Sequence, residues 1–125
     1  MIVFKHKGNF SKTDNFFKRV LKIDYLRILE KYGREGVAAL ASATPIDSSL
    51  TAHSWNYETN IYKNLLAINW TNSNVVGGLP IAILIQYGHG TKNGGYVQGR
   101  DYINPAIQPI FDKIVNDIWR EVKDL

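Results

Sequence analysis

The sequence predicts an α+β fold in which an antiparallel β-sheet, built on a central hairpin, is packed by a long helix from the N-terminal half and by a C-terminal helix. Two observations predict it. Apolar residues recur at spacings of three and four after Asp24 and again after Asn104, as on one face of a helix. Between these segments, residues 50–58 and 61–70 are rich in β-branched and aromatic residues, which is typical of strands.

The length and composition predict one domain, residues 1–125. Of the 125 residues, 45% are hydrophobic, which is enough for a core. No apolar run is long enough to span a membrane, and the first residues lack the pattern of a signal peptide. Because the chain has no cysteine, it can form neither a disulfide nor a thiolate metal site, which is consistent with an intracellular environment.

The net charge of +4 is unevenly placed along the chain. Residues 1–34 carry nine Lys and Arg against three acidic residues, whereas residues 35–125 carry six against eight. The basic first third could bind nucleic acid. It could instead provide the solvated faces of two helices, which is the commoner case, or meet an acidic neighbouring subunit in a ring. The residues concerned are Lys12, Lys18, Arg19, Lys22, Arg27 and Lys31.

The first elements are predicted to be a short strand and two helices. Residues 2–7 alternate and could form an edge strand whose lysines discourage unwanted pairing. Ser11 and the acid three residues later have capping-box spacing, which predicts a helix over residues 12–22. Asp24 is the predicted N-cap of a longer helix that ends before Pro45.

Two glycines lie inside this longer helix. Gly33 and Gly36 should each cost about 1 kcal/mol relative to alanine. Together with the alanines that follow, they give the helix a smooth face that lets another backbone approach closely. A glycine hinge is the less common alternative.

The two predicted strands form an antiparallel hairpin with a tight turn at Thr59 and Asn60. One face of the first strand would carry Thr51, His53, Trp55 and Tyr57, and one face of the second would carry Leu66, Ile68 and Trp70. Before the hairpin, Asp47 and the two serines after it predict an Asx or Ser turn, in which side-chain oxygens accept hydrogen bonds from backbone N–H groups.

Residues 78–105 combine a short apolar run, a glycine-rich loop and the start of a helix. Pro80 suits the first helical position and Gly88 the position after a helix end, so residues 81–87 are predicted to form a short helix that is buried on most sides. The loop from Gly88 to Gly99 contains five glycines, which open backbone conformations closed to other residues. We expect such a loop to contact another molecule.

The last helix is predicted to have Asn104 as its N-cap, Pro105 as its first residue and the end of the chain as its end. Pro109, at the fifth helical position, could bend the start of the helix. A single apolar stripe follows the helix and consists of Ile107, Phe111, Ile114, Ile118, Val122 and Leu125.

No residue pattern indicates catalysis or a cofactor. His89, Ser48 and Asp101 could be combined into a hydrolytic triad, but no nucleophile elbow surrounds the serine. Three scattered histidines without a metal-binding motif argue against a metal site. The glycine-rich loop also lacks the spacing of a phosphate-binding loop. We therefore expect a protein without a catalytic residue, metal or cofactor.

Aromatic and charged side chains accompany the glycine-rich loop. Tyr96, Arg100 and Tyr102 could bind nucleic acid by stacking and charge. Tyr and Arg are also the residues enriched at the anchor points of protein interfaces, and we favour that interpretation.

Three segments resemble the small neck or tail-completion proteins of long-tailed bacteriophages, which include tail-terminator-like proteins and are encoded between the head-closure and tail-tube genes. Residues 43–50, ATPIDSSL, followed by Ser54, are similar to the family motif A-x-P-[VI]-D-T-G-x-L…S. Residues 81–91, IAILIQYGHGT, are similar to its Y-A-x-x-[VL]-E-[FY]-G-T segment, and residues 102–107, YINPAI, to F-[IL]-x-P-A-[IL]. Order and spacing agree across residues 35–125.

Two departures from the family pattern affect local geometry. Ser48 and Ser49 replace the usual Thr-Gly, so the turn does not offer a left-handed glycine. Gln86 replaces the common Glu, which removes a charge near the glycine-rich loop. Neither position carries a reaction in that family.

The resemblance implies a structural virion protein that forms a homohexameric ring, in the neck or at the head-proximal end of the tail tube. It would be assembled in the host cytoplasm and could also form the collar of a headless tail particle. Its partners would be its own copies and tail-tube, sheath or head-closure proteins, with no membrane involved, and DNA could pass through the ring. The candidate interface residues are Asp47, His89, Lys92, Tyr96, Arg100 and Tyr102. The alternative function is a nucleic-acid-binding module that uses the basic first third.

Overall fold

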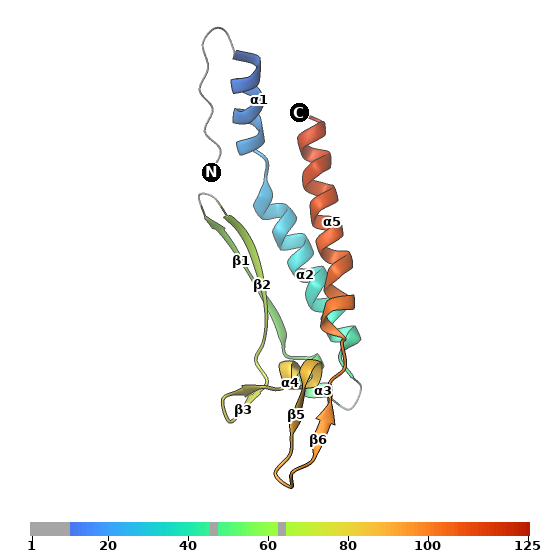
Figure 1. Cartoon of the computed structure of the whole chain (residues 1–125). Coiled ribbons are helices and arrows are strands. Elements are labelled where there is room, and N and C mark those ends of the chain that lie inside the picture. Colours follow the sequence, from blue (N-terminus) through green and yellow to red (C-terminus); the bar gives the residue numbers. More distant parts are fainter. Residues whose placement is uncertain (1–10, 46–47, 63–64) are drawn as a thin grey trace.

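A computed structural model describes residues 11–45, 48–62 and 65–125 (Figure 1). It is 57% helical and 23% strand with antiparallel strand pairs, which confirms the predicted α+β class. In chain order the elements are α1 (Ser11–Leu21), α2 (Tyr25–Ala43), α3 (Ser49–Ala52), β1 (Trp55–Tyr62), β2 (Leu65–Asn72), β3 (Val75–Val76), β4 (Leu79–Pro80), α4 (Ile81–Tyr87), β5 (Gly88–Gly90), β6 (Tyr96–Gln98) and α5 (Ile103–Lys123). The predicted strand over residues 2–7 lies outside the described residues.

The molecule is elongated and is built around α2. α5 runs beside α2, and the β1–β2 hairpin packs on α2 as well (Figure 1). α1 extends beyond α2 at one end, and the β5–β6 hairpin projects at the other. The strands of the described residues form three separate two-stranded antiparallel sheets.

The predicted ends of the first two helices are confirmed within a residue or two. α1 begins at Ser11. The side chain of Asp24 caps α2 by accepting a hydrogen bond from the backbone N–H of Arg27 at 3.1 Å. α2 ends at Ala43, and Thr44 adopts an extended conformation because it precedes Pro45.

The hairpin forms as predicted, but its turn and the first residue of its first strand differ from the prediction. Thr59 pairs with Ile68 and Asn60 with Ala67, so the predicted turn lies inside β1. The register instead pairs Tyr57 with Trp70, whose rings both lie on α2, and this packing outweighs a local turn preference. The predicted beginning of the first strand is helix α3, and the hydroxyl of Ser54, two residues after its end, donates to the carbonyl oxygen of Leu50 at 2.6 Å.

The glycines of α2 form the predicted packing face. The ring of Tyr57 lies on Gly33 and the indole of Trp70 lies on Gly36, and a Cβ atom at either glycine would come closer than 3.0 Å to that ring. Aromatic side chains, not a second backbone, therefore occupy this face.

Polar contacts also join α2 to α5. The hydroxyl of Tyr32 donates to Asp117 at 2.5 Å, and Arg27 pairs with Glu121 at 2.9 Å. Burial, followed by the hydrogen bond to Asp117, raises the pKa of Tyr32 to about 12. Tyr32 therefore stays protonated, and able to donate, at alkaline pH values where an ordinary tyrosine would begin to ionise.

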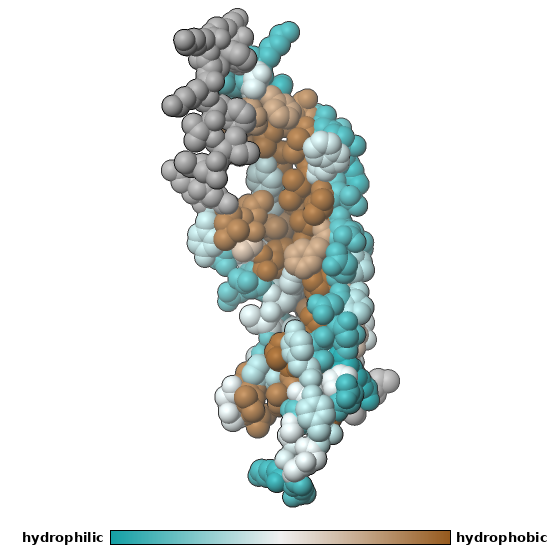
Figure 2. Space-filling model, in the orientation of Figure 1, coloured by the Kyte–Doolittle hydropathy of each residue, from teal (hydrophilic) through white to brown (hydrophobic). Residues whose placement is uncertain are grey.

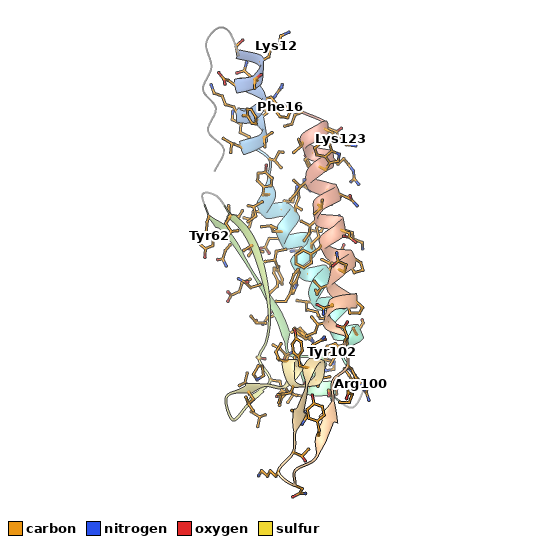
Figure 3. All side chains as sticks on the ribbon, viewed as in Figure 1. Lys12, Phe16, Tyr62, Arg100, Tyr102 and Lys123 are labelled. Carbon is orange, nitrogen blue, oxygen red and sulfur yellow. The ribbon has the colours of Figure 1, made fainter. Side chains whose placement is uncertain are left out.

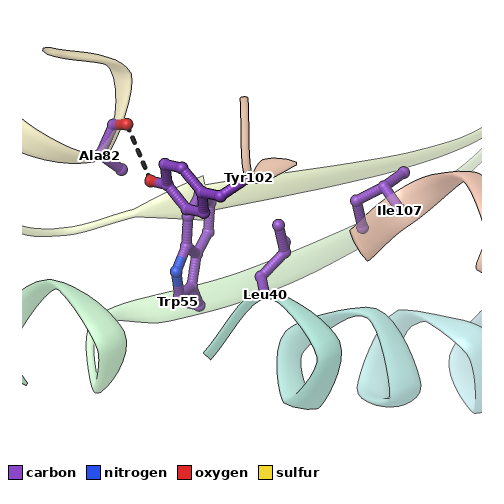
Figure 4. Packing of buried hydrophobic residues seen from close by; sticks show 5 residues of the cluster. All are labelled: Leu40, Trp55, Ala82, Tyr102 and Ile107. Carbon is purple, nitrogen blue, oxygen red and sulfur yellow. Dashed lines mark hydrogen bonds between the residues drawn. The ribbon is translucent and has the colours of Figure 1, made fainter. Parts of the chain in front are cut away.

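The core consists of two small clusters. One contains Leu40, Trp55, Ala82, Tyr102 and Ile107 (Figure 4), and the other contains Ile28, Tyr32, Ile110 and Ile114. The buried face of α5 thus follows Ile107, Ile110 and Ile114. Phe111, a member of the predicted apolar stripe, is 47% exposed and packs edge-on against Trp70 of β2.

The start of α5 differs from the prediction because its cap comes from α4. The side-chain oxygen of Gln86 accepts hydrogen bonds from the backbone N–H groups of Tyr102 and Ile103 at 3.0 and 2.9 Å. α5 therefore begins at Ile103, two residues earlier than predicted. Asn104, the predicted cap, donates its side-chain amide to Asp101 instead, at 3.0 Å.

α4 spans the predicted residues but is only half buried. Ala82 and Gln86 are buried, whereas Ile83 and Tyr87 are exposed. The helix ends at Gly88, which has the positive φ of 84° expected at this position.

Candidate assembly surfaces

Four of the six predicted interface residues lie on or beside the β5–β6 hairpin. Lys92 is in its turn, Tyr96 begins β6 and is 64% exposed, and Arg100 follows β6 (Figure 3). His89 lies in the middle of β5, opposite Val97, and is partly buried. These side chains share one end of the molecule.

Tyr102 is not part of this surface. Its side chain is only 7% exposed, and its hydroxyl donates to the carbonyl oxygen of Ala82 at 2.8 Å (Figure 4). Burial raises the pKa of Tyr102 to about 12. The prediction that Tyr102 belongs to an exposed loop is therefore wrong, because it packs into the core beside Trp55. Asp47 lies outside the described residues.

The predicted glycine-rich loop is the β5–β6 hairpin with a short turn. The backbone N–H of Thr91 donates to the carbonyl oxygen of Gly95 at 2.9 Å and closes the turn. Two of the five glycines serve the fold itself. A Cβ atom at Gly88 would meet the backbone of residues 97 and 99, and one at Gly99 would meet the backbone of residues 86–88, all closer than 3.0 Å. The free turn, residues 91–95, is thus the part of the loop that is open to another molecule.

Two depressions lie near this end. One, of about 140 Å³, lies between α4 and the β5–β6 hairpin and is lined in part by Ser48, His89 and Arg100. The Nδ1 atom of His89 is buried there and has no hydrogen-bond partner among the described residues. This volume is below the roughly 300–1,000 Å³ of small-molecule sites. The other, of about 360 Å³, lies beside Pro45 and His53, is open and is lined by small side chains.

Two kinds of feature are absent from the part of the chain that the structure describes. It contains no group of three or more His, Asp or Glu residues arranged to hold a metal ion. None of its helices combines the length and the apolarity needed to cross a membrane. Large apolar side chains are exposed on several of the described elements.

The first such surface is a line of residues on α5 that we call the α5 stripe: Phe111, Val115 and Trp119. They are spaced four residues apart, which places them on one side of the helix, and between 47 and 65% of each is exposed. Phe111 packs edge-on against Trp70 of β2, with ring centroids 5.8 Å apart, so the stripe begins on the side of α5 that faces the β1–β2 hairpin. Figure 2 shows hydrophobic surface running lengthwise in this region.

The second surface is the β3–β4 hairpin, residues 75–80, which projects from the body near α4 (Figure 1). Val75, Val76 and Leu79 are 50 to 62% exposed. The turn consists of Gly77 and Gly78, with φ values of 58° and 76°, as in the type I′ turns that match the twist of paired strands. Figure 2 shows this area as a second hydrophobic region at the lower end of the same face.

Sequence reasoning did not single out either surface, although one pattern points to the hairpin. Residues 64–91 contain no Asp, Glu, Lys or Arg. Charged side chains normally protect exposed strand edges from unwanted pairing, and their depletion is typical of the centre of protein interfaces.

No protein-family model matches the chain, and no curated protein or solved structure matches it either. The resemblance to bacteriophage neck and tail-completion proteins accordingly rests on the three sequence segments quoted above.

Proposed function

We propose that this chain is a non-enzymatic assembly protein that forms a ring of six copies in the neck or at the head-proximal end of a bacteriophage tail. The observation that carries the proposal is the exposure of large apolar side chains on two separate surfaces, the α5 stripe and the β3–β4 hairpin. Monomeric proteins rarely expose such patches, and contact with another protein removes them from water.

Two separate surfaces suit a ring better than a two-fold dimer. In a ring each copy presents one surface to a different surface of the next copy, whereas a two-fold dimer uses one surface twice. The three motif resemblances support the same assignment, because the family they indicate works as rings. DNA would pass through the opening of such a ring.

The β5–β6 hairpin is the proposed contact to the next component, a tail-tube, sheath or head-closure protein. It projects beyond the body at one end of the molecule and carries Lys92 and Tyr96. Tyr is enriched at the anchor points of interfaces, and a projecting end suits stacking of one ring on another. The protein would thus be found in the tail or neck of the virion.

Assembly is tested first by sedimentation and electron microscopy of the purified chain, alone and mixed with the tail-tube protein of the same particle. Closed rings in either sample are expected. A chain that stays monomeric in both samples would contradict the proposal, as would its absence from purified particles probed with an antibody against it.

The role of the β5–β6 hairpin is tested by replacing residues 91–95 with Asn-Gly. Gly90 pairs with Tyr96, so a two-residue type I′ turn can join them directly. The variant should fold and form rings but fail to join tails to their next component. Rings that join normally would rule out this hairpin as the contact.

The alternative function is a nucleic-acid-binding module. In its favour, α1 carries several basic residues and has no buried residue. Against it, two basic residues of α2 are partly neutralised by α5, since Arg27 pairs with Glu121 and Lys31 lies 3.9 Å from Asp117. Retention on DNA that falls steeply with salt concentration would favour this alternative.

A further inference from the structure

We propose that the β3–β4 hairpin of one copy docks on the α5 stripe of the next copy. This inference rests on the proposed self-assembly and goes beyond it by naming the two surfaces that meet. It commits to a second copy of this chain as the occupant of the stripe.

The hairpin is held in place by the residues around it. The backbone N–H of Ile81 donates to the carbonyl oxygen of Asn74 at 3.0 Å. The side chain of Asn74 donates to the hydroxyl of Thr51 at 2.9 Å, and the side chain of Asn72 donates to the carbonyl oxygen of Thr51 at 2.8 Å. A hairpin with two residues in each strand is not stable by itself, so these hydrogen bonds at its base hold its two apolar strands in position. Such pre-organisation reduces the entropy that a contact would cost.

The α5 stripe has the composition of an interface centre. Trp is the residue most often found among the side chains that dominate binding, and Phe and Val around it exclude water. A covered aromatic side chain buries about 150–250 Å². With Trp119 59% and Phe111 47% exposed, the two rings offer on the order of 200 Å². A standard interface buries about 800 Å² on each partner, so the stripe would be its centre and neighbouring residues its rim.

Charge is the reason for choosing a second copy as the partner. The hairpin lies within the uncharged residues 64–91 and offers no charged group to an acidic or basic partner. An apolar counterpart suits its exposed Val and Leu side chains, and the α5 stripe is such a surface on the same chain. Within one molecule the two lie apart, since the hairpin is beside α4 and the stripe is along α5 beyond its first turns (Figures 1 and 2). Only a second copy can bring them together.

The test uses two variants that each lose one surface. The hairpin variant carries Val76→Asp and Leu79→Asp, and the stripe variant carries Val115→Asp and Trp119→Asp. All four side chains are at least half exposed, so both variants should fold, which circular dichroism and urea unfolding will check. A matched control, Asn56→Asp, introduces the same acid at an exposed position of β1.

Each variant alone should stay monomeric, with self-association weakened at least about 30-fold, because residues at the centre of an interface each contribute 2 kcal/mol or more. An equimolar mixture of the two should form one-to-one dimers and nothing larger, since only one intact hairpin can meet one intact stripe. The control should assemble like the unmodified chain. Dimers in the mixture support the inference, and a mixture that stays monomeric overturns it.

A covalent test uses the absence of cysteine from the chain. The double variant Val76→Cys, Val115→Cys should give a ladder of cross-linked multimers on mild oxidation, whereas either single variant should give no species larger than a dimer. If the unmodified chain assembles and both surface variants assemble equally well, this inference fails while the proposed assembly function stands. If the unmodified chain never assembles, both fail.

Discussion

The indole N–H of Trp70 donates to the backbone carbonyl oxygen of Gly33 at 3.0 Å, while the indole ring lies on Gly36 one turn further along α2. This contact fixes β2 on the helix. The absence of a side chain at Gly36 makes room for the ring, so a helix-breaking residue type has a structural reason to be there.

The first prediction concerns this contact. Gly36→Ala should destabilise the protein by about 1–3 kcal/mol, because the added methyl group overlaps the indole and forces it to move. At an exposed helical position the same substitution would stabilise by about 1 kcal/mol. Urea unfolding measures the difference. In a Trp70→Leu background, Gly36→Ala should cause a smaller loss of stability than it does in the unmodified chain. A Gly36→Ala variant that is more stable than the unmodified chain would contradict the packing described.

The second prediction concerns the cap of α5. Gln86→Ala leaves the backbone N–H groups of Tyr102 and Ile103 without their acceptor and should cost about 1–3 kcal/mol. Gln86→Glu keeps the acceptor but places a carboxylate beside Asp101, whose Oδ1 now accepts from the Gln86 amide at 2.7 Å. Urea unfolding at neutral pH should therefore find Gln86→Glu less stable, and Asp101→Asn should restore part of the loss. If Asp101→Asn restores none of the stability lost in Gln86→Glu, repulsion between the two carboxylates is not the cause of that loss.

The third prediction concerns pH. The hydroxyls of Tyr57 and Thr59 donate to the carboxylate of Glu30 at 2.6 and 2.7 Å. These hydrogen bonds, that of Tyr57 first, lower the pKa of Glu30 from 4.5. Since the folded pKa lies below the unfolded one, the carboxylate contributes stability that is present above about pH 4.5 and is lost as the pH falls through the folded pKa.

The measurement compares urea midpoints of the unmodified chain and Glu30→Gln across this range. The unmodified chain should be the more stable at pH 7, and its advantage should shrink below pH 4.5. Glu58→Gln, on the exposed face of β1, is the matched control and should leave the acid dependence unchanged. An advantage that is constant with pH would show that Glu30 is not ionised when it makes these bonds.

The fourth prediction concerns a buried hydroxyl. Thr44 is 6% exposed, accepts from the indole N–H of Trp55 at 3.0 Å and donates to the carbonyl oxygen of Leu40 at 2.6 Å. Thr44→Val leaves the indole N–H buried without an acceptor, which should cost about 1–3 kcal/mol in thermal or urea unfolding. The same substitution made in a Trp55→Phe background should cost much less, because the unsatisfied donor is then absent.

Local patterns in the sequence predicted the helices and their nearby caps. The spacing of apolar residues identified α2 and α5, and Asp24 identified the start of α2, because both depend on residues within one or two turns. The packing role of Gly33 and Gly36 was also predictable, although the aromatic residues that use it were not. Pro80 and Gly88 likewise marked α4 correctly.

The wrong predictions concern features that are set by residues distant in the sequence. The turn at Thr59 and Asn60 was predicted from local preference, whereas the register is set by how β1 and β2 pack on α2. The cap of α5 comes from Gln86, sixteen or more residues earlier in the chain, and no local pattern indicates it. Tyr102 was placed on a surface for the same reason, since its burial depends on Trp55 and Ala82 from other elements.

The two core clusters share their helices, because α2 and α5 each contribute residues to both. Loss of one cluster would separate these helices and so deprive the other cluster of its two main walls. Despite its elongated shape, the chain should therefore denature in a single cooperative transition, with spectroscopic probes at Trp55 in one cluster and at Tyr32 in the other reporting the same midpoint.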